Sequence, residues 1–447
     1  MKRRPFITLA SAALLAPALA ATLAATFAPT LAHASGFDVQ TATRAYLDTL
    51  QGPARAKSDA YFEGGYWLIL WGALVAVLAD WLLLRFRLSA RFRDRAARVF
   101  RRPFGVAWLT GLFYTLWGAV ITLPWAIYTG FARELQYDLM NQSFAEWLAD
   151  YGKNAGVSLL IMPLFIAAIF AVIRRFPRGW WVLGSGLFAE FIAVGMLIGP
   201  VYLAPMFNTY TELPDGPVRD RIVALAEAND IPAHHIYLFD ASRQSNRISA
   251  NVSGLGPTIR ISLNDNLLKR TTMPEIMDVM GHEMGHYKLA HVRQMLGGLV
   301  LITLVLLFAA SRIVPWAIAR HGEKWGVRDA ADPAAMPVYG IALSFMVLLA
   351  TPVINNIIRH NEIAADKFGL DVAREPDGFA MVAMKLSEYR KIEPGPIEEF
   401  LFFDHPSGAA RVRMAMQWKK DHVADPQMVT PPPMPQSGMP QSGPGKE

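Results

Sequence analysis

The residues of this chain whose types and spacing best suit chemistry lie in His282-Glu283-Met284-Gly285-His286. Residues four apart share one face of a helix, so His282 and His286 can bind one metal ion through two imidazole nitrogens. Glu283 lies about 100° round the helix from His282, where it can take a proton from a water molecule that the metal activates. The stretch therefore predicts a metal site with an adjacent general base. The alternative, a core helix with two hydrogen-bonded histidines, leaves Glu283 unexplained.

The helix that carries this stretch is expected within residues 272–292. Thr272-Met273-Pro274-Glu275 is a capping-box pattern, with proline in the first turn where its missing N–H does no harm. A catalytic zinc site needs a third protein ligand. Glu362 is the best candidate, because Glu362 and Asp366 are four apart on a predicted helix. One of them can bind the metal while the other hydrogen-bonds a ligating imidazole. The alternative third ligands are His291, His360 and His405.

Composition limits the kind of protein. The chain of 447 residues has no cysteine, which excludes disulfides, thiolate metal sites and cysteine nucleophiles. It is 53% hydrophobic with a mean hydropathy of +0.24, which predicts long apolar spans joined to a soluble portion. The net charge is +6. Because the arginines cluster next to apolar spans, membrane topology explains them better than a nucleic-acid partner, and no such partner is expected.

Six apolar runs predict helices that cross a bilayer, since each is near the roughly 20 residues that a span requires. They are residues 66–84, 104–128, 156–173, 180–203, 295–310 and 336–358. The run at 295 is short, and a tilted or partly re-entrant segment is the alternative there.

The remaining segments complete a domain plan. Residues 1–34 begin with Lys2-Arg3-Arg4 and end in Ala32-His33-Ala34, as in a secretory signal peptide, with an uncleaved anchor as the alternative. The plan continues with 35–64 as a polar external segment, 65–203 as a four-span bundle, 204–294 and 359–424 as two parts of a catalytic domain, 295–358 as two spans between them, and 425–447 as a disordered tail.

The first catalytic part shows both helix and strand patterns. Residues 218–228 predict an amphipathic helix and 235–240 a strand, and 249–253 with 258–263 predict a hairpin around Gly254-Leu255-Gly256-Pro257. Asn264 or Asp265 is expected to cap a short helix. The predicted fold class is mainly α: a multi-span helical bundle with an α+β catalytic domain split by two spans.

Charge in the short loops predicts an orientation. Eight arginines and one acid lie in 85–102, and further basic residues lie in 174–178 and 312–328. Basic loops stay in the cytoplasm, so the alternate loops and both catalytic parts are expected to face outward. With the exported N-terminus, this predicts a bacterial inner-membrane protein whose catalytic portion faces the periplasm.

From about Glu63 to Trp418 the sequence resembles the membrane-integral zinc metalloproteases of the CAAX prenyl protease type, of the gluzincin class. The matching motifs are, in order, Leu123-Pro124-Trp125, Leu203-Ala204-Pro205-Met206-Phe207, Ser249-Ala250-Asn251, the stretch 282–289, Arg359 with Glu362 and Ala365-Asp366, and His405-Pro406 with Arg411. Two features depart from the family. Ile358 stands where serine is frequent, and six spans are predicted where eukaryotic members have seven.

The resemblance implies a zincin-like catalytic domain with one Zn²⁺ per chain. It implies that His282, His286 and Glu362 bind the metal and that Glu283 is the general base. It also implies that Asp366 contacts a metal ligand without binding the metal itself. It further implies that Asn251 and its strand hold an extended peptide, and that His405 and Arg411 lie near the site. We expect His405 to take part in catalysis and Arg411 in substrate binding.

The expected function is that of a zinc metalloendopeptidase acting on membrane-associated, hydrophobic or CAAX-like peptides. Its expected partners are peptide or membrane-protein substrates and the lipid bilayer. One alternative is a transporter or channel, which the polar residues Glu190, Asn355 and Asn356 would suit. Another is a scaffold that keeps a structural zinc site. The resemblance to eukaryotic members implies a site open to the cytosol, whereas the loop charges favour the outward side.

Overall fold

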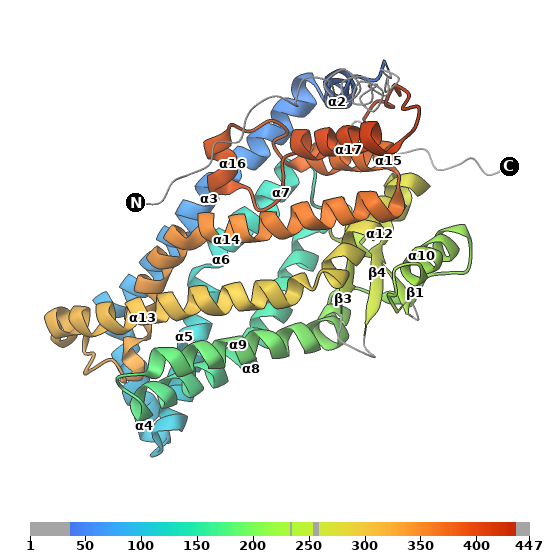
Figure 1. Ribbon diagram of the computed structural model, residues 1–447. Helices are drawn as coiled ribbons and strands as arrows, with labels where there is room; N and C mark the ends of the chain where they lie inside the picture. Colours follow the sequence, from blue (N-terminus) through green and yellow to red (C-terminus); the bar gives the residue numbers. More distant parts are fainter. Residues whose placement is uncertain (1–35, 233–234, 254–258, 435–447) are drawn as a thin grey trace, which may run out of the picture.

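The computed structural model describes residues 36–232, 235–253 and 259–434, and it is mainly helical (Figure 1). Within these residues, six helices are long and apolar enough to cross a membrane. They are α3 (Gly52–Arg85), α5 (Pro103–Ile121), α8 (Phe144–Arg175), α9 (Trp180–Ile198), α13 (His291–Trp325) and α14 (Met336–Ala373). The expectation of a multi-span helical membrane protein is confirmed.

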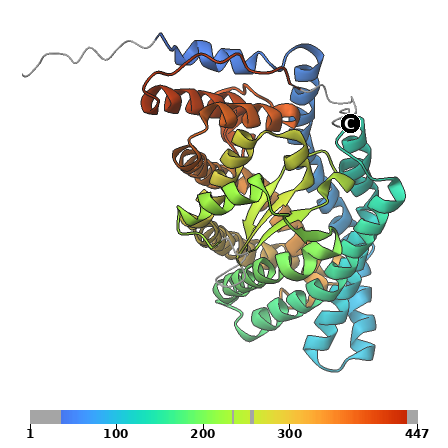
Figure 2. The same cartoon turned by 90° about the vertical axis from the view of Figure 1, so that its right-hand side faces the viewer.

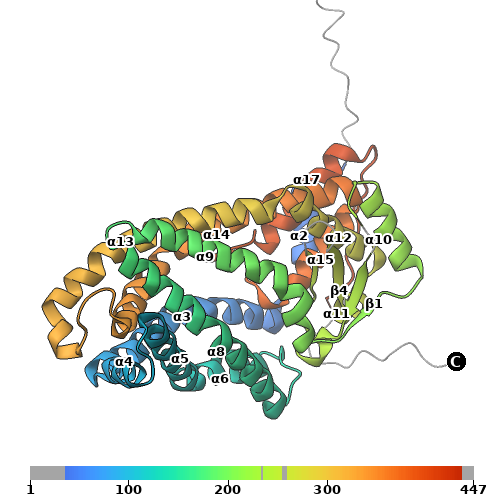
Figure 3. The ribbon, with the colours of Figure 1, turned by 90° about the horizontal axis from the view of Figure 1, so that it is seen from below.

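The long helices pack in a closed order that differs from their order in the chain. α3 packs on α14, α14 on α13, α13 on α9, α9 on α8, and α8 on α5 (Figure 3). The indole nitrogen of Trp117 on α5 donates to the carbonyl of Ala79 on α3 over 3.2 Å, which joins the two ends of this order. Large apolar side chains such as Leu160 and Leu349 on these helices are 73% and 79% exposed. Exposed apolar side chains on membrane helices suit contact with lipid.

Several helices extend beyond the predicted runs. α13 is one continuous helix of 35 residues with Pro315 inside it, so the partly re-entrant alternative at 295 is wrong, whereas the tilted one stays a prediction. α14 continues from the span without a break through Glu362 and Asp366 to Ala373. The third ligand candidate therefore lies on the extension of a membrane helix. The shorter elements of this half are α4 (Leu88–Val99), α6 (Leu123–Ile127), η1 (Tyr128–Ala132), α7 (Arg133–Gln136), η2 (Gly199–Leu203), η3 (Ala204–Met206) and η6 (Pro333–Ala335).

The first catalytic part contains a four-stranded sheet in the order β1-β2-β4-β3. Its strands are β1 (Tyr210–Glu212), β2 (Ile236–Phe239), β3 (Ala250–Ser253) and β4 (Arg260–Asn264). β3 and β4 pair antiparallel, as the predicted hairpin requires, whereas β2 runs parallel to β4. The turn at 254–257 lies outside the described residues. Helices α10 (Pro217–Glu227), α11 (Asp265–Arg270) and α12 (Met273–Lys288) follow the predicted pattern, and η4 is Ala241–Arg243.

The second catalytic part consists of α15 (Pro376–Leu386), η7 (Ser387–Tyr389), α16 (Pro396–Phe402) and α17 (Gly408–His422). Most of the predicted external segment, 35–64, is helical, and its first helix belongs to this part. Its α2 (Val39–Leu47) packs on α17 (Figure 2), and the hydroxyl of Tyr46 donates to Asp377 over 2.8 Å. Buried apolar residues of α2, such as Leu47, explain the packing, because they form one core cluster with α15 and α17.

The tail, 425–447, is predicted to be disordered. Residues 425–434 have no regular secondary structure, but Met434 is buried at 8% exposure in the core cluster that contains α2. One apolar side chain of the tail therefore reaches a core that the low-complexity sequence did not indicate, and the disorder of the tail stays a prediction. The predicted signal peptide, 1–34, and the rest of the tail, 435–447, lie outside the described residues.

The basic loops gather at the end of the bundle remote from the sheet. Arg93 on α4 forms an ion pair with Asp332, and Arg328 lies 3.6 Å from Asp94. Segments 85–102 and 312–328 therefore meet at one end, near α4, while α12 and the sheet lie at the other (Figure 1). The fold keeps the most basic short loops and the predicted metal site well apart.

Candidate active site

Three side chains from two helices converge on one point. The Nε2 atoms of His282 and His286 on α12 lie 3.1 Å apart. Oε2 of Glu362 on α14 lies 3.3 Å from Nε2 of His282, and Oε1 lies 3.4 Å from Nε2 of His286. A tetrahedral zinc ion with ligands at about 2.0–2.1 Å separates neighbouring ligand atoms by roughly 3.3 Å. The three side chains therefore gather at separations that suit one zinc ion, with each oxygen of Glu362 facing one histidine.

Four small residues let α12 and α14 approach closely enough to form this group. A Cβ atom at Gly281 would lie 3.1 Å from the Cα of Gly369, and one at Gly285 would lie 3.2 Å from the Cα of Ala365. Both contacts are with backbone atoms. The two glycines of the motif therefore allow the backbones of α12 and α14 to come close together, and this close contact is how the two helices pack. At its start, α12 is held by Thr272, whose backbone N–H donates to Glu275 over 3.0 Å.

Asp366 and Arg411 hold His282 in position. Nδ1 of His282 lies 2.8 Å from Oδ1 of Asp366, and a proton donated there leaves the Nε2 lone pair free for a metal. The guanidinium of Arg411 donates from Nε to Oδ2 of Asp366 over 2.8 Å and from a terminal nitrogen to Oδ1 over 2.7 Å. Arg411 is 7% exposed and also lines the pocket beside the site. This paired geometry favours a positioning role for Arg411 over the expected contact with substrate.

The histidines considered as alternative ligands occupy different places. Nδ1 of the buried His291 lies 3.0 Å from Nδ1 of His286, so it faces the ring nitrogen that points away from the metal site. His360 is exposed on α14. Nε2 of His405 lies 3.3 Å from Oε2 of Glu362, and its Nδ1 lies 2.8 Å from Asp404. Among the described residues, only His282, His286 and Glu362 form a metal-binding group.

The pKa values of the titratable side chains near the metal site on α12 are shifted in different directions. Burial alone would lower the pKa of His282, but its bonds to Asp366 and Glu362 raise that pKa to about 10. Burial, together with the charge of His282, lowers the pKa of His286 to about 4. The same negative charge that attracts a proton to His282 also attracts a metal cation. Burial raises the pKa of Glu283 to about 7, in the range that suits a general base near neutral pH.

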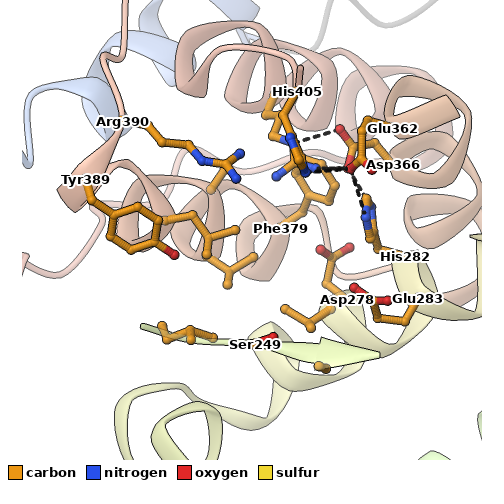
Figure 4. Close-up of a pocket in the computed structure, with 17 residues that line it drawn as sticks. Ser249, Asp278, His282, Glu283, Glu362, Asp366, Phe379, Tyr389, Arg390 and His405 are labelled. Atoms are coloured by element: carbon orange, nitrogen blue, oxygen red, sulfur yellow. Dashed lines mark hydrogen bonds and ion pairs between the residues drawn. The ribbon is translucent and has the colours of Figure 1, made fainter. Parts of the chain in front are cut away.

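A pocket of about 170 Å³ opens beside this group (Figure 4). Its walls come from the sheet edge at Ile248, Ser249 and Ala250, from α12, from α15 with η7, and from His405 with Arg411. β3 is the last strand of the sheet, so in the described residues its outer edge pairs with no other strand. Asn251 lies on β3 next to Ala250, opposite Ser262 of β4. Ser249 and Ala250, rather than Asn251, line the pocket.

Sequence reasoning did not single out four polar residues near the site: Asp278, Tyr389, Arg390 and Asp404. Asp278 stands four residues before His282, a helix spacing that could have indicated it. It is 2% exposed, and its Oδ1 has no hydrogen-bond partner in the described part of the chain. Burial raises its pKa well above the usual value. Tyr389 ends η7, and Arg390 and Asp404 lie in loops, and the sequence gives no such signal at these three positions.

Two protein-family models match the chain. The CAAX prenyl protease N-terminal family, described as five membrane helices, matches residues 44–209, and peptidase family M48 matches residues 212–419. Residues 44–209 contain four candidate spans, one fewer than that description. The boundary between the matches falls where the membrane bundle gives way to the sheet.

Individual relatives agree with these matches. The chain is 27% identical over 318 residues to an uncharacterized metalloprotease, YhfN, of Bacillus subtilis, covering 71% of this chain and 74% of the relative. It is 25% identical over 318 residues to CAAX prenyl protease 1 of Saccharomyces cerevisiae, covering 68% and 70%. The crystal structure of S. mikatae Ste24p superposes with a TM-score of 0.69 at 18% identity, covering 85% of this chain and 96% of that one. This last likeness supports the fold.

Proposed function

We propose that this chain hydrolyses peptide bonds at a zinc ion bound by His282, His286 and Glu362. The chain belongs to peptidase family M48 and has the membrane helices of the CAAX prenyl proteases, and it is a multi-pass membrane metalloendopeptidase. One observation carries the ligand assignment: the two imidazole Nε2 atoms lie 3.1 Å apart, and each lies 3.3–3.4 Å from one oxygen of the Glu362 carboxylate, close to the separation of ligands around one zinc ion. One zinc ion per chain is expected.

The residues around the metal have separable roles in this proposal. Zinc in a site with three protein ligands acts as a Lewis acid and makes water a nucleophile near neutral pH. Glu283 accepts the proton of the attacking water and then passes it to the leaving amine. His405, oriented by Asp404, lies where it can donate a hydrogen bond to the carbonyl oxygen as negative charge develops there. Asp366 keeps the imidazole of His282 in the tautomer that binds metal, and Arg411 keeps Asp366 in place.

The free edge of β3 supports a mode of substrate binding. An extended peptide can pair with it as an added strand, so that main-chain hydrogen bonds give affinity and the adjacent pocket gives selectivity. Asn251 lies on this strand and is proposed to help position the peptide. The substrate class proposed is membrane-associated, hydrophobic or CAAX-like peptides, because a relative that covers most of the chain is named CAAX prenyl protease 1.

The orientation remains part of the proposal. We place the catalytic part on the outer side of a bacterial inner membrane, because the most basic short loops lie at the opposite end of the bundle. Two of the three polar residues that suited a transporter, both on α14, have partners on α16: Asn355 donates to the carbonyl of Leu401 and Asn356 to that of Phe400. Both join α14 to α16.

The substitution Glu283→Gln tests the proposal. It removes the base but keeps the size and leaves all three proposed metal ligands intact. Purified Glu283→Gln protein should keep its zinc content and lose almost all cleavage of a membrane-peptide substrate. Comparing membrane peptides that accumulate in cells with wild type and with Glu283→Gln would identify natural substrates. Full activity of the variant would exclude this mechanism.

A further inference from the structure

The cations that line the pocket beside the metal site differ in whether an acid accompanies them. Arg411 donates two hydrogen bonds to Asp366, and His405 lies 2.8 Å from Asp404. Arg390 also lines the pocket, but within residues 36–232, 235–253 and 259–434 its guanidinium has no hydrogen bond or ion pair. The acids whose charges reach it, Asp404 and Glu362, act only at a distance. Arg390 is therefore the cation of this pocket that lacks a partner.

The backbone fixes Arg390 where it stands. Its N–H donates to the carbonyl of Ser387 over 3.4 Å, and its own carbonyl accepts a hydrogen bond from the Ser58 hydroxyl over 3.0 Å. Ser58 is buried on α3, so the loop after η7 is anchored to the membrane bundle. The side chain is partly buried, and it reaches into the space between Tyr389 and His405 (Figure 4).

Arg390 is partly exposed in the pocket, so its guanidinium is accessible to an anion that enters. Arginine stays charged in proteins, so it can bind such an anion throughout the ordinary pH range. Asp278 also lines the pocket, and its Oδ1 has no hydrogen-bond partner among the described residues, but it comes from α12 and lies beside His282 rather than beside Arg390 (Figure 4). A planar guanidinium with free N–H groups matches the two oxygens of a carboxylate.

Building on the proposed function, we propose that Arg390 binds a carboxylate of the substrate peptide and thereby helps to select the bond that is cleaved. A peptide paired with the edge of β3 passes Ser249 and Ala250, which line the same pocket as Arg390. The pocket volume of about 170 Å³ holds one side chain or one terminal residue. The carboxylate comes either from the end of the peptide chain or from an aspartate or glutamate side chain.

Peptides that differ in one carboxylate separate these two sources. The two peptides of the first pair have the same sequence, but one ends in a free carboxylate and the other in an amide. The peptides of the second pair both end in an amide and differ in carrying glutamate or glutamine at one position, which is varied along the residues near the cleaved bond. The kcat/KM of each peptide is measured with wild type, Arg390→Gln, Arg390→Lys and, as a control, Arg413→Gln, which changes an exposed arginine on α17. Binding of labelled peptides to Glu283→Gln, by fluorescence anisotropy, gives a readout without turnover.

A charge-assisted hydrogen-bonded pair is worth about 10- to 100-fold in affinity. Wild type should prefer the free acid, or the glutamate peptide, by that factor in both assays. Arg390→Gln should remove the preference while the amide and glutamine peptides are cleaved as before, Arg390→Lys should restore part of it, and Arg413→Gln should retain it. The proposal would be overturned if wild type cleaved and bound the acid and amide peptides equally well, and the glutamate and glutamine peptides equally well. It would also be overturned if Arg390→Gln lowered kcat/KM by the same factor for all peptides. Failure of wild type to cleave any peptide would count against the proposed function instead, because the binding preference in Glu283→Gln is measured independently.

Discussion

Replacing Gly369 with alanine tests whether the close approach of α12 and α14 sets the metal geometry. A Cβ atom at 369 would lie 2.9 Å from the amide nitrogen of His282 and 3.2 Å from its Cα. Both are backbone atoms, so no side chain can turn away to make room. Because non-bonded heavy atoms prefer separations of about 3.5–4.0 Å, α14 must move from α12 by roughly 0.5–1 Å at this point.

The size of the effect follows from how little displacement a metal site tolerates. Glu362 lies two turns from Gly369 on the same helix, and metal–ligand distances tolerate only about 0.2 Å. Overpacking costs about 1–3 kcal/mol, and the helix propensity of alanine returns up to about 1 kcal/mol. If the remaining strain falls on the site, zinc affinity decreases by roughly 5- to 50-fold.

Zinc affinity is measured by competition with a chelator, with thermal unfolding and kcat/KM determined on the same preparations. The control is Gly297→Ala on α13, where a Cβ would meet nothing within 4 Å. That variant should keep wild-type zinc affinity and equal or higher stability, since alanine is the better helix former. Zinc affinity of Gly369→Ala within twofold of the Gly297→Ala value would refute the reasoning.

Four further predictions follow from the site and the loops. Glu362→Ala should abolish stoichiometric zinc binding in metal analysis, and full occupancy would reject it as the third ligand. Arg411→Gln leaves Asp366 buried with one partner fewer, so zinc affinity or activity should fall about 10–100-fold, which chelator competition would detect. Asn251→Ala should reduce cleavage in a peptide assay at unchanged zinc content, and unchanged kinetics would limit β3 to a structural role. A reporter fused after Asp425 should be active if it functions only in the periplasm, and the opposite result would reverse the proposed orientation.

Much of the architecture could be predicted because it depends on neighbouring residues in the chain. The pairing of His282 and His286 needs only the period of one helix. The six spans follow from runs of apolar residues, and the cap of α11 follows from Asn264, whose side chain accepts the N–H of Leu267 over 2.8 Å. These features are local, so sequence alone determined them.

The limits of the spans were less predictable, because polar residues continue a helix when other parts of the protein cover them. α3 begins at Gly52, well before its apolar run, and α14 runs past its apolar run to Ala373. Packing against α17 also made a helix of residues 39–47, where composition indicated an external segment.

The site itself needed the tertiary structure. Glu362 lies eighty residues after His282 in the numbering, and it reaches the histidines because Gly281 and Gly369 let two backbones touch. Spacing in the sequence could not separate Glu362 from His291 or His405, since each is a good ligand type at a plausible distance along the chain. Nor could it show that Arg411 is paired with Asp366 while Arg390 has no partner in the described chain. Whether a charged side chain is paired depends on what packs against it from elsewhere in the chain, and only the folded arrangement of helices decides that.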